Sequence, residues 1–263
     1  VLIARRQPGS PHESEEDEAD EKEKKKKLPL WLRVAIPLIV LAVAAGGYFG
    51  VQKYMTHEAE LKMADLLSKV AQDTAVDTFA AYSKAVEEIE LGLKRYHNSR
   101  KARTMLVEYY ARLLLDFAPD NLNWQDRMEQ IFSTLPQQVY NDADVLQARG
   151  WRAFAQNKPG DLRFILDTAA EKKLVNDDLL CLEGELNLYD RKFDAAISFF
   201  KRAIENNPRL VRALYKKALA EIETGEKSEG TEDLSKTLKD SPEHLGAKLA
   251  MLETELDKRS EER

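Results

Sequence analysis

The chain has 263 residues, of which 33% are charged, and its formal net charge is −6. A general nucleic-acid-binding protein is usually basic, so this balance argues against nucleic acid as a partner. The single cysteine, Cys181, excludes an intramolecular disulfide framework and a multi-cysteine zinc site, and the four histidines have no metal-ligand spacing. The first residue is Val1 rather than Met, so we expect a fragment or a processed form.

Residues 1–27 form a charged tail in which the acidic residues precede the lysines. The stretch "HESEEDEADEKEKKKK" has almost no apolar residue whose burial could offset the entropy cost of ordering. We therefore predict a disordered cytoplasmic tether. A sharper interpretation is that the lysines also hold anionic lipid headgroups, at ~1 kcal/mol each, while the acidic block contacts a basic partner.

Residues 28–52 are predicted to form one transmembrane helix. No charged residue occurs from Val34 to Val51, and about eighteen residues are close to the minimum for a helix that crosses a bilayer. Trp31 lies at one end and Tyr48 near the other, where aromatic residues prefer the membrane interface. Pro37 lies inside the span and is expected to kink the helix.

Two other interpretations of this segment stay open. The first is a core helix of a soluble domain, although such a helix would have a polar face, which this stretch lacks. The second is a cleaved signal peptide, because Ala42-Val43-Ala44 matches the small-x-small cleavage pattern. However, the long acidic segment before the span differs from the short basic start of a signal peptide. We therefore expect the span to be retained.

The lysines next to the span predict its orientation. Lysines at 22 and 24–27 precede it, whereas only Lys53 and Lys62 are close on the other side. By the positive-inside rule, the N-terminus is cytoplasmic and the rest of the chain lies across the membrane. In a bacterial inner membrane that compartment is the periplasm, which is the localisation we expect. A eukaryotic organelle membrane stays an alternative.

Ala42, Gly46 and Gly50 lie on one face of the predicted span. They are four residues apart, which is the arrangement of small residues that lets two transmembrane helices touch. We therefore predict a helix contact at this face, either with a second copy of the chain, which would make a homo-oligomer, or with another subunit.

The chain after the span is predicted to be helical almost throughout, so the fold class is all-α. Gly and Pro are few and cluster at breaks, and no run of alternating β-branched residues indicates a strand. Residues 53–142 are interpreted as divergent helical hairpins. Within them, "TFAAYSKAVEEIE" at 78–90 is typical of the second helix of a repeat, whereas 99–135 is helical but breaks the repeat phase.

An internal repeat occupies residues 143–244. Gly150, Gly184 and Ala218 are 34 residues apart along it. The three predicted units are 143–176, 177–210 and 211–244. A period of this length indicates stacked helical hairpins, each of which buries its apolar face against its neighbours. The small residues let the two helices of a hairpin approach closely.

The middle unit resembles a tetratricopeptide repeat. The family's small, small, aromatic, alanine and proline positions are occupied by Gly184, Ala196, Phe200, Ala203 and Pro208. The resemblance implies a right-handed superhelical solenoid of antiparallel helix hairpins, with 245–263 as a solvated capping helix. The flanking units depart from the pattern at Thr237 and at Leu162, and the first unit lacks a terminal proline.

The resemblance also implies that partner proteins bind on the concave face, which the first helix of each unit lines. The family's groove positions fall on Gln147, Trp151, Phe154, Asp178, Cys181, Glu185, Leu188, Arg212, Tyr215, Leu219 and Ile222. Their aromatic and apolar members predict a groove for an amphipathic helix or an extended segment. Alternatively, Trp151 and Phe154 belong to the core between the helices.

The sequence contains no glycine-rich phosphate loop, HExxH zinc motif or nucleophile elbow. We therefore expect no enzyme activity, cofactor, metal or small-molecule substrate. The expected function is a protein–protein interaction scaffold or assembly factor of a membrane or envelope complex, with other proteins and membrane lipid as partners. The alternatives are a chaperone-like accessory subunit of a secretion channel, and an enzyme whose catalytic domain precedes Val1.

Overall fold

The computed structural model describes residues 29–136 and 142–261, and all regular secondary structure in those ranges is α-helical. The predicted all-α class is therefore confirmed. The predicted charged tail at 1–27 lies outside the described residues. The chain divides into two compact units, Val1–His57 and Glu58–Arg263, which are described separately.

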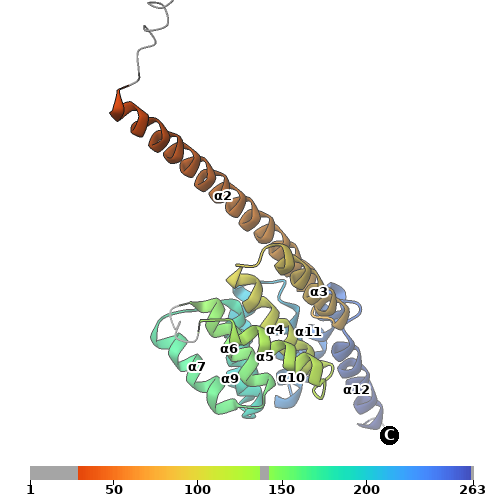
Figure 1. Ribbon diagram of the computed structural model, residues 1–263. Helices are drawn as coiled ribbons and strands as arrows, with labels where there is room; N and C mark the ends of the chain where they lie inside the picture. The colour runs from red at the N-terminus through yellow and green to blue at the C-terminus, as the bar shows by residue number, and fades with distance from the viewer. Residues whose placement is uncertain (1–28, 137–141, 262–263) are drawn as a thin grey trace, which may run out of the picture. The chain divides into compact units, whose positions relative to one another are not determined.

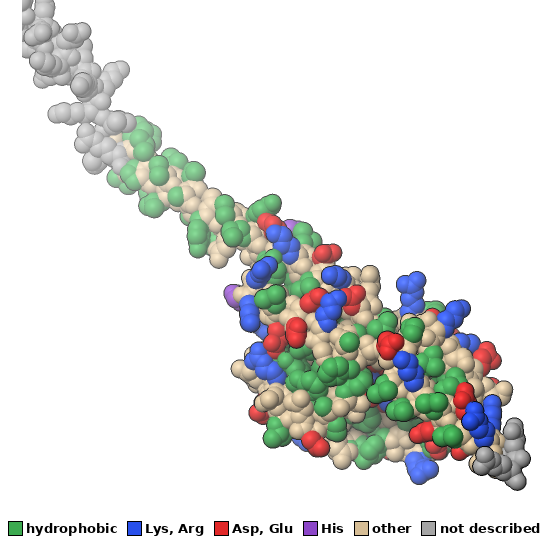
Figure 2. All heavy atoms as spheres, turned by 90° about the vertical axis from the view of Figure 1, so that its right-hand side faces the viewer, with side chains coloured by type: hydrophobic (Ala, Val, Ile, Leu, Met, Phe, Trp, Pro, Cys, Tyr) green, Lys and Arg blue, Asp and Glu red, His purple; other side chains and the backbone are tan. Residues whose placement is uncertain are grey.

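In the first unit, the N-terminal part of α2 is an exposed apolar helix. α2 extends from Leu30 to Thr74 and continues through Pro37. Its most apolar window has a mean hydropathy of 2.2, and none of that window is buried. Figure 2 shows hydrophobic side chains along this segment. By length and composition alone, this helix could cross a membrane.

The second unit is a stack of helical hairpins followed by one more helix. The hairpins are the C-terminal part of α2 with α3 (Phe79–Arg95), α4 (Arg100–Asp116) with α5 (Leu122–Ser133), α6 (Ala143–Ala155) with α7 (Pro159–Glu171), α8 (Asp177–Tyr189) with α9 (Phe193–Asn206), and α10 (Val211–Thr224) with α11 (Lys227–Asp240). The last helix, α12, extends from Leu245 to Glu261. The first helices α4, α6, α8 and α10 contact one another in that order and form the inner layer (Figure 1).

Four helices of this unit begin 34 residues apart. They are α6, α8, α10 and α12, which start at Ala143, Asp177, Val211 and Leu245. The first three starts coincide with the first residues of the three predicted repeat units. The fourth start gives α12 the register of the first helix of a further unit, although no second helix follows it within the described residues.

Glycines bring neighbouring helices into close contact. A Cβ atom at Gly184 would lie 2.5 Å from the Phe200 ring, and one at Gly150 would lie 2.8 Å from the Leu182 side chain. Cβ atoms do not approach other atoms so closely in a packed interior. Both positions therefore favour a small residue, as the repeat pattern predicts, and the contact with the Phe200 ring makes Gly184 the tighter of the two.

Local capping explains where several helices begin. The side chains of Thr78, Ser99, Asn121, Asp142 and Asn176 each accept a hydrogen bond from a backbone N–H two or three residues further on. Such caps satisfy donors that the first turn of a helix leaves free. α10 ends at Gly225, whose φ of 93° is left-handed and favours glycine.

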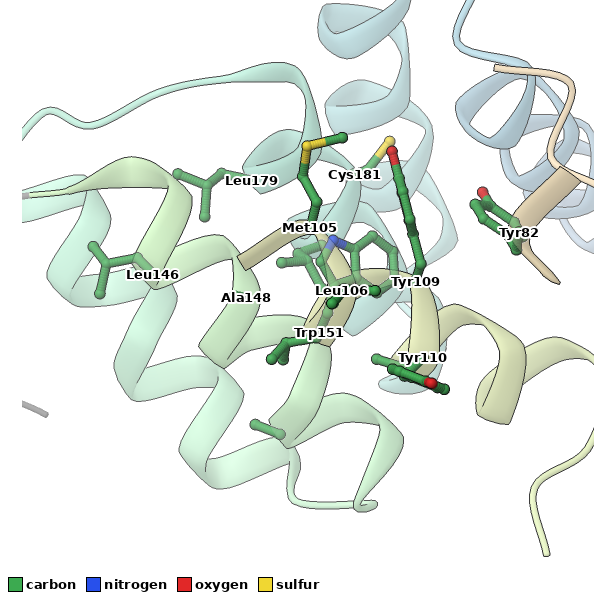
Figure 3. Close-up of a cluster of buried hydrophobic side chains, with 14 of the residues drawn as sticks. Tyr82, Met105, Leu106, Tyr109, Tyr110, Leu146, Ala148, Trp151, Leu179 and Cys181 are labelled. Atoms are coloured by element: carbon green, nitrogen blue, oxygen red, sulfur yellow. The ribbon is translucent and has the colours of Figure 1, made fainter. Parts of the chain in front are cut away.

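The largest buried cluster is centred on α4. Every residue from Thr104 to Leu114 is buried, because α3, α5 and α6 all pack against this helix. Figure 3 shows the middle of the cluster, where Trp151 of α6 lies beside Leu106 and Tyr109 of α4 and near Cys181 of α8. A smaller cluster joins α10, α11 and α12 through Ala218, Leu234, Ala247 and Ala250.

Candidate partner-binding surface

The structure places the predicted groove residues on the inner layer, but it buries several of them. Gln147, Trp151, Cys181, Glu185 and Arg212 are buried, and Trp151 and Cys181 have no exposed surface. The partly exposed members are Phe154, Asp178, Leu188, Tyr215, Leu219 and Ile222. A partner could reach the buried members only if the array opened, so their role in binding stays a prediction.

Trp151 lies between two arginines. The guanidinium carbon of Arg112, on α4, is 4.6 Å from the centroid of the indole ring, and that of Arg212, on α10, is 5.0 Å from it. Guanidinium groups this close to an indole are attracted by the ring's quadrupole, more strongly where water is excluded. Trp151 therefore joins α4, α6 and α10, which belong to three hairpins, by cation–π contacts as well as by packing.

Arg112 is held by acidic and hydroxyl groups from three helices. Its Nη2 lies 2.6 Å from Oε1 of Glu108 and donates a 2.5 Å hydrogen bond to Oδ1 of Asp178, while its Nη1 donates a 2.8 Å hydrogen bond to the hydroxyl of Tyr82. Gln147 donates a 2.5 Å hydrogen bond to the other oxygen of Glu108. The predicted groove residues Gln147 and Asp178 therefore complete an internal network.

Arg212 is held by three carboxylates. Its Nη1 donates a 2.5 Å hydrogen bond to Asp116 and lies 3.5 Å from Asp77. Its Nη2 lies 2.7 Å from Oε1 of Glu185, and this contact is an ion pair that lacks hydrogen-bond geometry. Lys216 lies 3.6 Å from Asp116 and 3.5 Å from Glu185. Because Arg212 is only 2% exposed, its charge is balanced almost entirely by protein groups.

The first and last hairpins of the second unit meet at their loops. The Ser241 hydroxyl donates a 2.6 Å hydrogen bond to the carbonyl oxygen of Val76, and Nε2 of His244 lies 3.3 Å from Oδ2 of Asp77. The Tyr82 hydroxyl donates a 2.5 Å hydrogen bond to the other oxygen of Asp77. The contacts of Ser241 and His244 join segments more than 160 residues apart, so the two ends of the array are in contact.

Burial and charge together set the pKa values in this network. Burial alone would raise the pKa of the Asp77 carboxyl, but the Arg212 charge and the hydrogen bond to His244 hold it well below its usual range. Burial raises the pKa of Glu108 to about 7, although Arg112 opposes the shift. Asp77 is therefore held ionised, whereas Glu108 titrates near neutral pH.

The network is suited to holding helices together rather than to catalysis. Its carboxylates face arginines, and burial raises the pKa of the Cys181 thiol well above its ordinary value, so the reactive thiolate is disfavoured. No group of His, Cys, Asp or Glu side chains that could hold a metal ion is found within the described part of the chain. The remaining predicted residues pack locally, with Phe154 against Tyr189 and Tyr215 against His244.

More than half of the network belongs to no predicted site. Its unpredicted members are Asp77, Tyr82, Glu108, Arg112, Asp116, Lys216 and His244. Asp77, Asp116, Lys216 and His244 each look like an ordinary solvated polar residue in their own segment. One signal was available, since Glu108 and Arg112 are four residues apart inside the apolar run "TMLVEYYARLLL". A charged pair at that spacing within an apolar helix indicates a buried ion pair.

The predicted contact face of the span is exposed to solvent within the first unit. Ala42, Gly46 and Gly50 are exposed, and a Cβ atom added at either glycine would meet no atom within 4 Å. Such a surface leaves room for a second helix at close range. Pairing through this face stays a prediction.

Comparison with solved structures identifies the fold. TTC0263, a thermophilic TPR protein of Thermus thermophilus, is similar with a TM-score of 0.52 and 16% identity, over 74% of this chain and 99% of that chain. MamA gives a TM-score of 0.37 over 70% of this chain and 92% of that chain, and PilW, a type IV pilus biogenesis factor, gives 0.46 over 77% and 92%, both at 16% identity. No family model and no curated protein matches the sequence.

The helical array is therefore a tetratricopeptide-type solenoid, as the middle repeat predicts. The TM-score to the thermophilic protein and the helical hairpins support this fold together. The chain is an all-α protein that combines such a solenoid with one apolar helix near its N-terminus. At 16% identity, the likeness establishes the fold and leaves function to the site.

Proposed function

We propose that this protein is a membrane-anchored, non-enzymatic scaffold or assembly factor that binds other proteins of a membrane or envelope complex through its solenoid. One observation carries the proposal: a single chain combines a tetratricopeptide-type array with a long apolar helix, of which the most apolar window has no buried residue. Arrays of this kind present extended surfaces to other proteins, and an exposed apolar helix of this length is suited to a bilayer.

The charge pattern supports one orientation. The lysines at 24–27 directly precede the apolar segment, whereas the residues that follow it carry few basic side chains. The positive-inside rule then puts the N-terminus in the cytoplasm and the solenoid on the other side, which is the periplasm if the membrane is a bacterial inner membrane.

A partner would meet the partly exposed inner residues first. Phe154 and Leu188 are partly exposed at the edge of the main core, and Tyr215, Leu219 and Ile222 are partly exposed at the edge of the smaller cluster of α10, α11 and α12. Amphipathic helices and extended segments bind such surfaces by placing apolar anchors against them. The buried Trp151–Arg212 network lies behind and fixes the positions of the helices that carry these residues.

Topology is tested by protease treatment of bacterial cells that express the full chain. We expect the protein to resist carbonate extraction from membranes, and the solenoid to be cut in spheroplasts without lysis. Solenoid fragments that are protected until lysis would overturn the proposed orientation. Release of the protein from membranes by carbonate would overturn the proposal that the apolar helix is a membrane anchor.

Partner binding is tested by crosslinking and affinity purification from solubilised membranes. Phe154→Ala and Leu188→Ala are expected to reduce capture of a partner, whereas Phe164→Ala, which truncates an outer-layer residue that is 64% exposed, should leave it unchanged. One stoichiometric partner supports a scaffold. A ladder of many client chains, crosslinked from Tyr215, would favour the chaperone-like alternative instead.

A further inference from the structure

α12 carries an exposed leucine stripe on the side that faces away from the array. The stripe consists of Leu245, Leu249, Leu252 and Leu256, which are between 51% and 64% exposed. Their spacings of four, three and four residues are those of a coiled-coil seam, so the leucines follow one face of the helix. The opposite face is buried through Ala247, Ala250 and Thr254. The expected capping helix therefore carries an apolar stripe on its outer side, in addition to its charged end.

The repeat register shows that this face is a contact face. Leu252 occupies the position that Gly150, Gly184 and Ala218 occupy in the first helices of the preceding units. In α8 this position touches the second helix of the hairpin, because Gly184 packs against Phe200. In α12 the same position remains exposed, with 55% of Leu252 accessible to solvent.

The size of Leu252 determines which kind of helix can pack against the leucine stripe of α12. A second helix of a repeat hairpin approaches so closely that only a small residue is tolerated, as at Gly184. Leucine at each seam position instead suits a helix at the ordinary separation of about 8–10 Å, with knobs-into-holes packing. An occupant with its own leucine seam fits this surface better than a repeat-type second helix does.

The charges beside the stripe attract the opposite charges on a second, antiparallel copy of the helix. Lys248 and Glu255 flank the seam on one side, at the same heptad position one heptad apart. In an antiparallel pair of identical helices, Leu249 faces the partner's Leu252, and Lys248 faces the partner's Glu255 twice, once on each side of the symmetry axis. Two attractive charge pairs therefore accompany the apolar contact.

We propose that α12 binds α12 of a second copy of this chain, antiparallel, through the leucine stripe. Lys248 already forms a 3.0 Å ion pair with Glu243 of its own chain, but this pair is exposed and is exchanged for the intermolecular one at little cost. Four leucines per chain cover less than a standard interface of about 1,600 Å², so the dimer is expected to depend on concentration. This contact is separate from any pairing of the span.

Disulfide crosslinking of the full chain tests the pairing and its direction. In a Cys181→Ala background, which removes the one native cysteine, differently tagged Leu249→Cys and Leu252→Cys proteins are mixed and oxidised. We expect crosslinked dimers that contain both tags, and few dimers from either protein alone. Same-residue dimers, a crosslink to another protein, or no crosslink would overturn the proposal. Circular dichroism checks that both exposed substitutions leave the fold intact.

Charge reversal provides an independent test by sedimentation of the purified full chain. Lys248→Glu or Glu255→Lys alone should weaken self-association by more than about tenfold, because each places like charges opposite one another twice. The double variant should restore it, which a parallel pair would not allow, since Lys248 would then face the partner's Glu253. Lys258→Glu, away from the seam, is the matched control. Unchanged single variants, or a double variant that fails to restore association, would overturn the proposal.

The double variant Gly46→Leu, Gly50→Leu separates the α12 contact from pairing of the span, because dimers formed through α12 should survive these substitutions.

Discussion

Arg212 of α10 and Asp116 of α4 form an ion pair across 96 residues of sequence, with 2.5 Å between Nη1 and Oδ2. The same guanidinium reaches Glu185 of α8 and Asp77 at the first hairpin. Its guanidinium carbon also lies 5.0 Å from the centroid of the Trp151 ring on α6. One buried side chain therefore contacts all five hairpins, and its ion pair with Asp77 joins the fifth hairpin to the first.

Replacing Arg212 should destabilise the folded state strongly. Arg212→Met keeps much of the side-chain volume but removes the main counter-charge of the buried Asp77 and Glu185, of which only Glu185 still has Lys216 nearby. We therefore expect a loss of about 3–5 kcal/mol in the free energy of unfolding. Urea denaturation measures it. Arg209→Met is the matched control, because Arg209 is exposed, and it should change the stability by less than about 0.5 kcal/mol. Equal effects of the two substitutions would contradict the role of the network.

Labelling of Cys181 should report the opening of the inner layer. Its thiol is fully buried, and burial raises its pKa, so the native protein should react slowly with a thiol reagent. Asp77→Asn removes one of the three carboxylate charges around Arg212 and weakens the contact with His244. We expect labelling at least about tenfold faster without denaturant. If the labelling rate stays the same while the stability falls, the loop contacts do not control access to the groove.

Packing at the hairpin contact predicts opposite effects at two glycines. Gly184→Ala would place a Cβ atom 2.5 Å from the Phe200 ring, so we expect a loss of about 1–3 kcal/mol in the free energy of unfolding. Gly160→Ala on α7 has no atom within 4 Å and should stabilise the protein by up to about 1 kcal/mol. Adding Phe200→Leu to Gly184→Ala should recover part of the loss. A neutral Gly184→Ala would show that the two helices can separate freely.

The repeat could be read from the sequence because its causes are local. Small residues such as Gly184 and a proline such as Pro208 act on their own hairpin, and the 34-residue period records the stacking of one hairpin on the next. The helix starts at 143, 177 and 211 follow from this pattern. The C-terminal part of α2 with α3, and α4 with α5, also form hairpins, although their sequence keeps little of the repeat pattern.

The closed inner layer could not be read from the sequence in the same way. Asp77, Asp116 and Arg212 belong to different hairpins, and the composition of one segment does not predict which distant charged residue it will contact. A groove assignment based on resemblance assumes an open concave face, whereas Ser241 and Val76 join the two ends of the array. The leucines of α12 were visible in the sequence, but their exposure follows only from which face of α12 packs against α10 and α11.

The shifted pKa of Glu108 predicts how stability depends on pH. Burial raises this pKa from 4.5 to about 7 in the folded state, against Arg112 and Lys101, while Asp178 adds to the shift. Between those pH values the folded state holds a proton that the unfolded state has released. The free energy of unfolding should therefore fall as pH rises through this window, by on the order of 3 kcal/mol.

Glu108→Gln isolates this effect because the amide stays neutral at every pH. Its amide oxygen can still accept a hydrogen bond from Arg112, but its NH2 group faces the Gln147 amide that donates to Glu108, and this loss is the same at every pH. The stability of the variant relative to the wild type should therefore rise as the pH increases from 5 to 8. Urea denaturation of both proteins at pH 5, 6, 7 and 8 measures the difference, and other titrating groups cancel between them. Parallel pH profiles would contradict the raised pKa.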